Sequence, residues 1–194
     1  MKPVSVETIN LEVFRQFPVL HTPRLLLRQL NVSDSNEIFA IRSNPNVNRF
    51  IGREEMQESK TAEQLINDTL DRYKTHQSIA WAAELRGNTK IIGACGFNRI
   101  EHHNLRAELG GELSPEYWGK NIALEAVKEI IRFGLNEMNL HSIEARIQSG
   151  NLGAVHLVEK LGFVKEGHFR DHIYFKGKFH DLLVYSKVKE TRSS

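Results

Sequence analysis

Cysteine is nearly absent from the sequence. Cys95 is the only one in 194 residues, so the chain can form no internal disulfide and no zinc site built from cysteines. Cys95 lies in an apolar run, residues 91–97, where we expect a small buried side chain instead of a nucleophile. The reactive groups therefore have to come from other residue types.

Long apolar runs are also absent. No stretch approaches the ~20 apolar residues that a membrane-spanning helix requires, and residues 1–7 lack the apolar core of a signal peptide. The 26 Lys and Arg residues nearly balance the 24 Asp and Glu residues, which leaves a formal charge of +2. That charge is too small to predict a nucleic-acid partner. We therefore expect a cytoplasmic protein that binds neither membranes nor nucleic acid.

Nine histidines are present, but their spacing does not predict a metal site. His102 and His103 lie in a predicted turn. His168 and His172 are four residues apart on a predicted strand, where that spacing is far wider than on a helix. No Asp or Cys completes a set at metal-ligand spacing. We predict no bound metal.

The rest of the composition is ordinary for a globular protein. Hydrophobic residues make up 40% of the chain and charged residues 26%, and the length is enough for one domain with a proper core. We expect an N-terminal arm (1–20) that docks on the body through Phe14, Phe17 and Leu20. A single domain (21–188) and a polar tail (189–194) follow.

Hydrophobic periodicity predicts both strands and helices. Strands are expected at 22–30, 78–85, 90–100, 106–113, 142–148, 163–174 and 179–188, and helices at about 35–44, 60–76, 120–138 and 151–161. Residues 46–58 are expected to form a loop or broken helix. The short turns between 78 and 113 predict an antiparallel meander. The strand–helix–strand order over 106–148 predicts a right-handed crossover and one parallel pair. The predicted fold class is α+β, with a central mixed, mostly antiparallel sheet.

One stretch, residues 107–123, carries a chemical signal. A short strand ends at Ser114-Pro115, a tight loop contains Gly119, and an amphipathic helix begins near Lys120. Such a loop directs free backbone N–H groups and the positive end of a helix dipole into one small space, which is an arrangement that binds phosphate. The alternative is a plain N-terminal turn of a packed helix.

This order of elements, with its motifs, resembles the GNAT superfamily of acetyl-CoA-dependent N-acetyltransferases, and within it the RimJ/RimL-type branch, which includes ribosomal-protein N-terminal acetyltransferases. The resemblance covers roughly residues 21–188. It rests on four segments: Thr22 to Arg28, Glu112 to Lys120, Glu159 to Phe163, and Gly177 to Ser186. The resemblance implies a GNAT-like fold with helices on both faces of the sheet.

The resemblance also implies a binding site for acetyl-CoA. Its pyrophosphate is expected on the loop that opens the long helix, at Trp118, Gly119, Lys120, Asn121, Ile122 and Ala123. Asn121 departs from the glycine that the family usually has. Because asparagine tolerates positive φ, we expect the loop to keep its shape and the cofactor to bind more weakly. Leu113 and Ser114 are expected to bond the pantetheine arm through their main chains. Asn151 either reaches the cofactor or only caps its helix.

Acetyl transfer requires a neutral amine and a polarised thioester carbonyl. Glu112 lies nearest the predicted strand break and matches an acidic position in this branch, so it is our candidate for the base or for an amine-binding carboxylate. The alternative is a surface carboxylate that tunes the local field. The N–H of Leu113 is the candidate for polarising the carbonyl. Glu108, farther from the strand break on the same strand face, is expected to be structural.

The proton donor is less defined. Many superfamily members have a tyrosine on the short helix, where this chain has Val158, and members of this branch often have a serine where it has Ala154. Tyr174, His156 and His172 are the remaining candidates. The alternative is that the thiolate leaves without an acid.

The expected function is transfer of an acetyl group from acetyl-CoA directly to a primary amine, with a protein N-terminus as the expected acceptor. A small amine, such as a polyamine, amino sugar or amino-acid derivative, is an alternative acceptor. A non-catalytic acyl-CoA-binding module on the same fold is the other alternative. A monomer and a homodimer are both compatible with the sequence.

Overall fold

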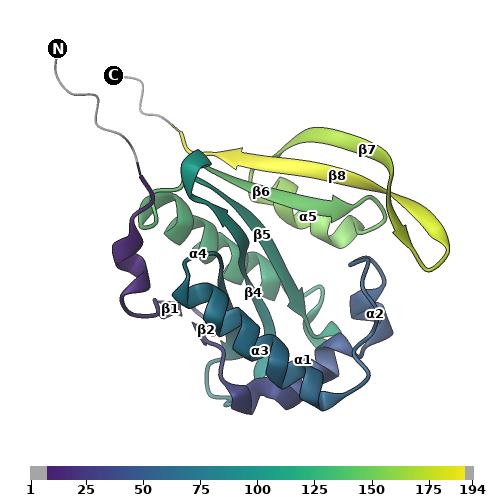
Figure 1. The fold of residues 1–194 in the computed structure, drawn as a ribbon, viewed down its shortest axis with the longest axis horizontal. Coiled ribbons are helices and arrows are strands. Elements are labelled where there is room, and N and C mark those ends of the chain that lie inside the picture. Colours follow the sequence, from purple (N-terminus) through teal and green to yellow (C-terminus); the bar gives the residue numbers. More distant parts are fainter. Residues whose placement is uncertain (1–7, 191–194) are drawn as a thin grey trace.

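A computed structural model describes residues 8–190, and these form one eight-stranded sheet with helices on both faces (Figure 1). The strand order is β1-β2-β3-β4-β5-β6-β8-β7, and only β5 and β6 are parallel neighbours. The strands are β1 (Leu20–His21), β2 (Leu25–Gln29), β3 (Ile79–Leu85), β4 (Ile91–Glu101), β5 (Arg106–Leu113), β6 (Ser142–Gln148), β7 (Val164–Phe175) and β8 (Lys178–Val188). The predicted α+β class, the meander and the single parallel crossover are confirmed.

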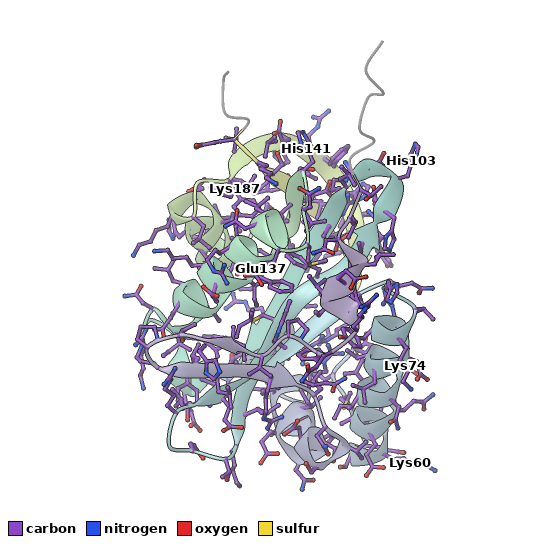
Figure 2. The ribbon with its side chains drawn as sticks, turned by 90° about the vertical axis from the view of Figure 1, so that its left-hand side faces the viewer. Lys60, Lys74, His103, Glu137, His141 and Lys187 are labelled. Carbon is purple, nitrogen blue, oxygen red and sulfur yellow. The ribbon has the colours of Figure 1, made fainter. Side chains whose placement is uncertain are left out.

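The helices lie close to their predicted positions. They are α1 (Ser35–Arg42), α2 (Pro45–Asn48), α3 (Ser59–Lys74), α4 (Ile122–Asn136) and α5 (Leu152–Lys160), with 3-10 turns η1 (Leu11–Phe14), η2 (Val32–Asp34), η3 (His102–Asn104) and η4 (Pro115–Tyr117). Figure 2 shows α3 running between Lys60 and Lys74. None of the helices in the described residues is both long and apolar enough to cross a bilayer.

The prediction of one strand over 22–30 is wrong in its first three residues. The backbone turns at Thr22, whose N–H donates to the carbonyl of Leu25 (3.0 Å), and the strand restarts at Leu25. Pro23 has no N–H to give to a sheet and favours such a turn. The result is a small hairpin of β1 and β2 in which Leu20 is opposite Leu27.

Two hydrophobic clusters hold the helices to the sheet. On one face α4 packs on β3 and β4, where the Trp81 ring meets Phe133 edge-on at 5.5 Å. Gly134 permits that approach, because a Cβ there would lie 2.6 Å from Phe97 Cζ. On the other face Ile38 of α1 and Ile66 of α3 pack over the sheet in a separate cluster. Burial of these apolar side chains is the main source of stability.

The described part of the arm, residues 8–20, docks on the body. Phe14 is buried against Tyr73 of α3, with ring centroids 5.4 Å apart. The Asn10 N–H donates to the carbonyl of Met138 (2.9 Å), and the Trp81 Nε1–H donates to that of Pro18 (2.7 Å). The remainder of the predicted arm and tail, residues 1–7 and 191–194, lies outside the described residues.

The last hairpin extends past the rest of the sheet (Figure 1). β6 pairs with β8 from Ser142–Val188 to Gln148–Leu182, whereas residues 178–180 of β8 pair only with β7. At its other end the hairpin is joined to the end of α5, because Lys187 Nζ donates to the carbonyl of Leu161, the C-cap of that helix (2.9 Å). Lys187 is labelled in Figure 2. The hairpin carries exposed aromatic side chains, including Phe169 and, in its projecting part, Tyr174 and Phe179.

Candidate active site

The two parallel strands at the centre of the sheet part along their length. β5 and β6 pair from Arg106–Ser142 to Leu109–Ala145, and beyond Leu109 the described chain gives β5 no partner on that side. A cavity of about 680 Å³ occupies the gap and is lined by residues 110–113 of β5 and 145–148 of β6. This volume is in the range of small-molecule sites.

The loop from β5 to α4 forms one end of the site. Gly119 and Asn121 both have positive φ, +72° and +57°, so Asn121 adopts the left-handed conformation expected of it. The side chain of Asn121, the N-cap of α4, accepts no hydrogen bond from the helix within the described residues. The first-turn N–H groups of α4 are thus available to a ligand, and the helix dipole favours an anionic one.

The structure explains the segment at Thr22 to Arg28. Arg24 donates to the carbonyls of Lys120 (3.0 Å) and Asn121 (3.2 Å), and its Nε lies 2.6 Å from Glu125 of α4. Thr22 also donates to Glu125, at 2.5 Å. Burial opposes ionisation of Glu125, but the hydrogen bonds from Thr22 and Arg24 prevail and lower its pKa. Thr22 and Arg24 therefore fix the loop and hold the Glu125 carboxylate.

At the end of β5, the backbone groups of Leu113 and Ser114 point in opposite directions. The Ser114 N–H donates to Ile92 on β4 (2.8 Å) and its carbonyl accepts from Tyr117 (3.0 Å), so both backbone groups of Ser114 are already paired. Because backbone groups alternate between neighbouring strands, those of Leu113 face the gap. The Leu113 carbonyl accepts from Trp118 Nε1 (2.9 Å). The Leu113 N–H is therefore better placed for a ligand than either Ser114 group.

Glu112 is the most constrained side chain of the site. Its carboxylate is 5% exposed and accepts from Arg42 Nε (2.6 Å) at the end of α1 and from Arg53 Nη2 (2.5 Å) after α2. We call these three residues the Glu112 cluster, and its formal charge is +1. Its carboxylate is thus held by charge-assisted hydrogen bonds, the stronger kind. Glu112 is therefore a buried carboxylate and not one at the surface.

Asn48 holds the cluster together. It is 1% exposed, its Oδ1 accepts from Arg53 Nε (2.8 Å), and its Nδ2 donates to the carbonyls of Arg42 (2.6 Å) and Asn44 (2.9 Å). Neither Arg42, Arg53 nor Asn48 was predicted from the sequence. Arg42 and Asn48 resemble ordinary polar positions in a local pattern, and only the fold brings them to Glu112.

Of the remaining predicted residues, some line the cavity and others do not. Asn151 lines the cavity and caps α5, accepting from the Ala154 N–H (3.2 Å). Ala154 and Val158 also line the cavity and supply no hydroxyl. His156 is exposed on α5. The structure does not bring Tyr174 and His172 to the cavity. They flank Ile173, which lines it, and successive strand residues point to opposite faces.

Two other observations limit the chemistry. Burial raises the pKa of the Cys95 thiol to about 12, so this cavity-lining sulfur is a neutral thiol and a poor nucleophile. Within residues 8–190, no three His, Cys, Asp or Glu side chains come together as a metal site.

Comparison with known proteins agrees with this geometry. Residues 24–164 match the acetyltransferase (GNAT) domain family. The sequence is 36% identical over 173 residues to the uncharacterised N-acetyltransferase YoaA of Bacillus subtilis, an alignment that covers 89% of this chain and 98% of YoaA.

Solved structures share the fold. The spermidine N-acetyltransferase of Vibrio cholerae in complex with CoA and spermine superposes with a TM-score of 0.77 at 25% identity, covering 85% of this chain and 95% of that one. RimL, a ribosomal L7/L12 alpha-N-protein acetyltransferase in complex with CoA, superposes with a TM-score of 0.79 at 14% identity, covering 88% and 98%. These two solved structures therefore share the fold and differ in their acceptors.

Proposed function

The chain belongs to the GNAT acetyltransferase family, and on that premise we propose that it transfers an acetyl group from acetyl-CoA directly to the N-terminal amine of a protein. The observation that carries this proposal is the gap between β5 and β6. The buried Glu112 carboxylate lines this gap, and the loop that follows β5 has free backbone N–H groups at the start of α4. An amine fits the first feature and a phosphate-bearing donor fits the second.

For acetyl-CoA, the residues present fit the role expected of them. Trp118, Gly119, Lys120, Asn121, Ile122 and Ala123 are proposed to hold the pyrophosphate at the start of α4, with Leu113 bonding the pantetheine arm. The Leu113 N–H is our candidate for polarising the thioester carbonyl. Asn151 lines the same cavity and is proposed to reach the cofactor in addition to capping α5.

The transfer is proposed to be direct. A covalent acetyl-enzyme would need a nucleophile, and the pKa of about 12 for Cys95 keeps its thiol protonated at neutral pH. We propose that Glu112 accepts the proton of the amine, releasing an arginine contact as it does so. Since Tyr174 and His172 are not in the cavity wall, we propose that the thiolate leaves without an acid.

Charge supports a protein N-terminus over a polyamine. The cavity is lined by Arg42, Arg53, Arg72 and Arg146 but only by Glu108 and Glu112, a net formal charge of +2. A polyamine carries several positive charges and would be repelled, whereas a peptide N-terminus carries one. Exposed Phe169, Tyr174 and Phe179 on the adjoining hairpin offer apolar surface for a macromolecular acceptor. The same positive lining makes a small amine with a carboxylate, such as an amino-acid derivative, the second candidate.

The test is thiol release from acetyl-CoA across a panel of amines. We expect release with short peptides that have a free N-terminus, less with amino-acid derivatives, and least with spermidine. Faster release with spermidine than with any peptide would overturn the acceptor assignment. Tight acetyl-CoA binding without release for any amine would instead indicate the non-catalytic binding module.

A further inference from the structure

The second strand at the gap ends in a buried polar side chain to which the proposed reaction gives no role. Gln148 is the last residue of β6 and is 7% exposed. Within residues 8–190, its Oε1 is the one fully buried side-chain nitrogen or oxygen atom without a hydrogen-bond partner. Buried polar atoms are almost always paired, because an unpaired one costs stability. This oxygen therefore indicates a ligand that donates a hydrogen bond.

The direction of Gln148 follows from strand alternation. Ile143, Ala145 and Ile147 pack in the core with α4, so Gln148 is on the opposite face of β6. Glu112 is on that same face of β5, since it contacts Arg42 of α1. Both side chains thus point away from α4.

Gln148 and Glu112 are also level with each other. The register that pairs Arg106 with Ser142 and Leu109 with Ala145, continued by three residues, sets Glu112 opposite Gln148. The strands no longer pair there, and both residues line the cavity between them. A small group in the gap would have Glu112 on one side and Gln148 on the other.

The two side chains differ in their availability. Both oxygens of Glu112 already accept from guanidinium groups, whereas the Gln148 oxygen has no donor. Apolar residues of the same cavity wall, Phe50, Ile173 and Leu182, offer it none. No donor of the described residues reaches this oxygen, so the cavity is the side from which a donor can approach.

Resting on the proposed function, we propose that Gln148 binds the acceptor amine, with Oε1 accepting one N–H of the amine on the side opposite Glu112. A neutral carboxamide does not take the proton away at neutral pH. Its role is to orient the nitrogen, so that one N–H is fixed and the lone pair is left free for the thioester. This oxygen favours a primary amine, because a primary amine still has one N–H after it has attacked the thioester and lost a proton.

The test is Gln148→Met, which keeps the length of the side chain and removes the acceptor oxygen. We expect kcat/KM for the best peptide of the panel to fall about tenfold, as for the loss of one hydrogen bond. The dissociation constant of acetyl-CoA, measured by calorimetry, should not change. The midpoint of thermal unfolding without ligand should stay the same or rise, because an unpaired buried polar atom has been removed.

Gln64→Met is the matched control, since Gln64 is exposed on α3 and should leave all three measurements unchanged. A lower unfolding midpoint for Gln148→Met would show a structural role and overturn the inference. Weaker acetyl-CoA binding with unchanged acceptor kinetics would assign the carboxamide to the cofactor and overturn it as well. An active wild type with an equally active variant overturns this inference alone, whereas a wild type inactive on every amine overturns the proposed function and the inference with it.

Discussion

The loop before α4 (the loop end of the site) and the side chains around Glu112 (the acceptor end) are built in different ways. The loop end presents main-chain N–H groups of a few consecutive residues, arranged by two left-handed residues, Gly119 and Asn121. The other end presents side chains from three separate elements, gathered around Glu112. The first depends on backbone conformation, and the second on a buried carboxylate that two arginines hold. Substitutions should therefore affect the acceptor end strongly and the loop end weakly.

The largest effect is expected from Glu112→Gln. The substitution removes the proposed base and leaves Arg42 and Arg53 without their shared carboxylate. General-base catalysis contributes about 10²–10⁴-fold, so we expect kcat to fall at least about 100-fold. Steady-state thiol release at saturating acetyl-CoA measures this. A rate within threefold of wild type would show that Glu112 is not the base.

A loss of activity in Glu112→Gln distinguishes the two ends only if acetyl-CoA binding at the loop end is unaffected. The dissociation constant of acetyl-CoA for Glu112→Gln should stay within about twofold of wild type, since Glu112 is not part of the loop. A Glu108→Gln variant serves as the control. It neutralises the other carboxylate in the cavity wall, and it should keep most of the activity.

An intermediate effect is expected from Arg24→Met at the loop end. Arg24 donates to two loop carbonyls and pairs with Glu125, but it is 45% exposed, so its ion pair is weakened by solvent. Losing these contacts and releasing a carboxylate near the phosphate site should weaken acetyl-CoA binding about fivefold, by loss of about 1 kcal/mol. Calorimetry measures this. A change confined to the KM of the amine would contradict the division between the two ends.

The smallest effect is expected from Asn121→Gly. Asn121 has φ +57°, a conformation that glycine adopts without a Cβ penalty. We expect acetyl-CoA to bind about two- to threefold more tightly, with unchanged KM for the amine. Lys176→Gly is the control, because Lys176 also has positive φ, +47°, but lies in the turn between β7 and β8. It should leave acetyl-CoA affinity unchanged.

The loop end of the site could be predicted from the sequence, because its signals are local. The strand–loop–helix over 107–123 is a local signal, because Gly119 and the helical pattern after it lie within a few residues. The meander and the parallel crossover followed from turn lengths and element order. The position of Gln148 opposite Glu112 also follows from the register, once β5 and β6 are known to pair.

The acceptor end could not be predicted in the same way. Arg53 lies 59 positions from Glu112 in the chain, and no local pattern distinguishes it from other surface arginines. Tyr174 and His172 were candidates because of their chemistry, but one strand position decides whether a side chain faces the cavity or solvent. Ile173 takes the inward position. The break at Pro23 was missed because proline is also tolerated at the first positions of a strand.

The loop before α4 is proposed to bind acetyl-CoA through its main chain, and this affects which substitutions such an enzyme can tolerate. A binding site formed by backbone N–H groups tolerates most changes of side chain, because every residue except proline offers the same donor. The acceptor end, in contrast, changes with single substitutions on α1, after α2 or at the end of β6. On the proposed assignment of the loop, a protein with this fold can thus change its acceptor while keeping its acetyl donor. The spermidine and ribosomal-protein acetyltransferases that share the fold have different acceptors.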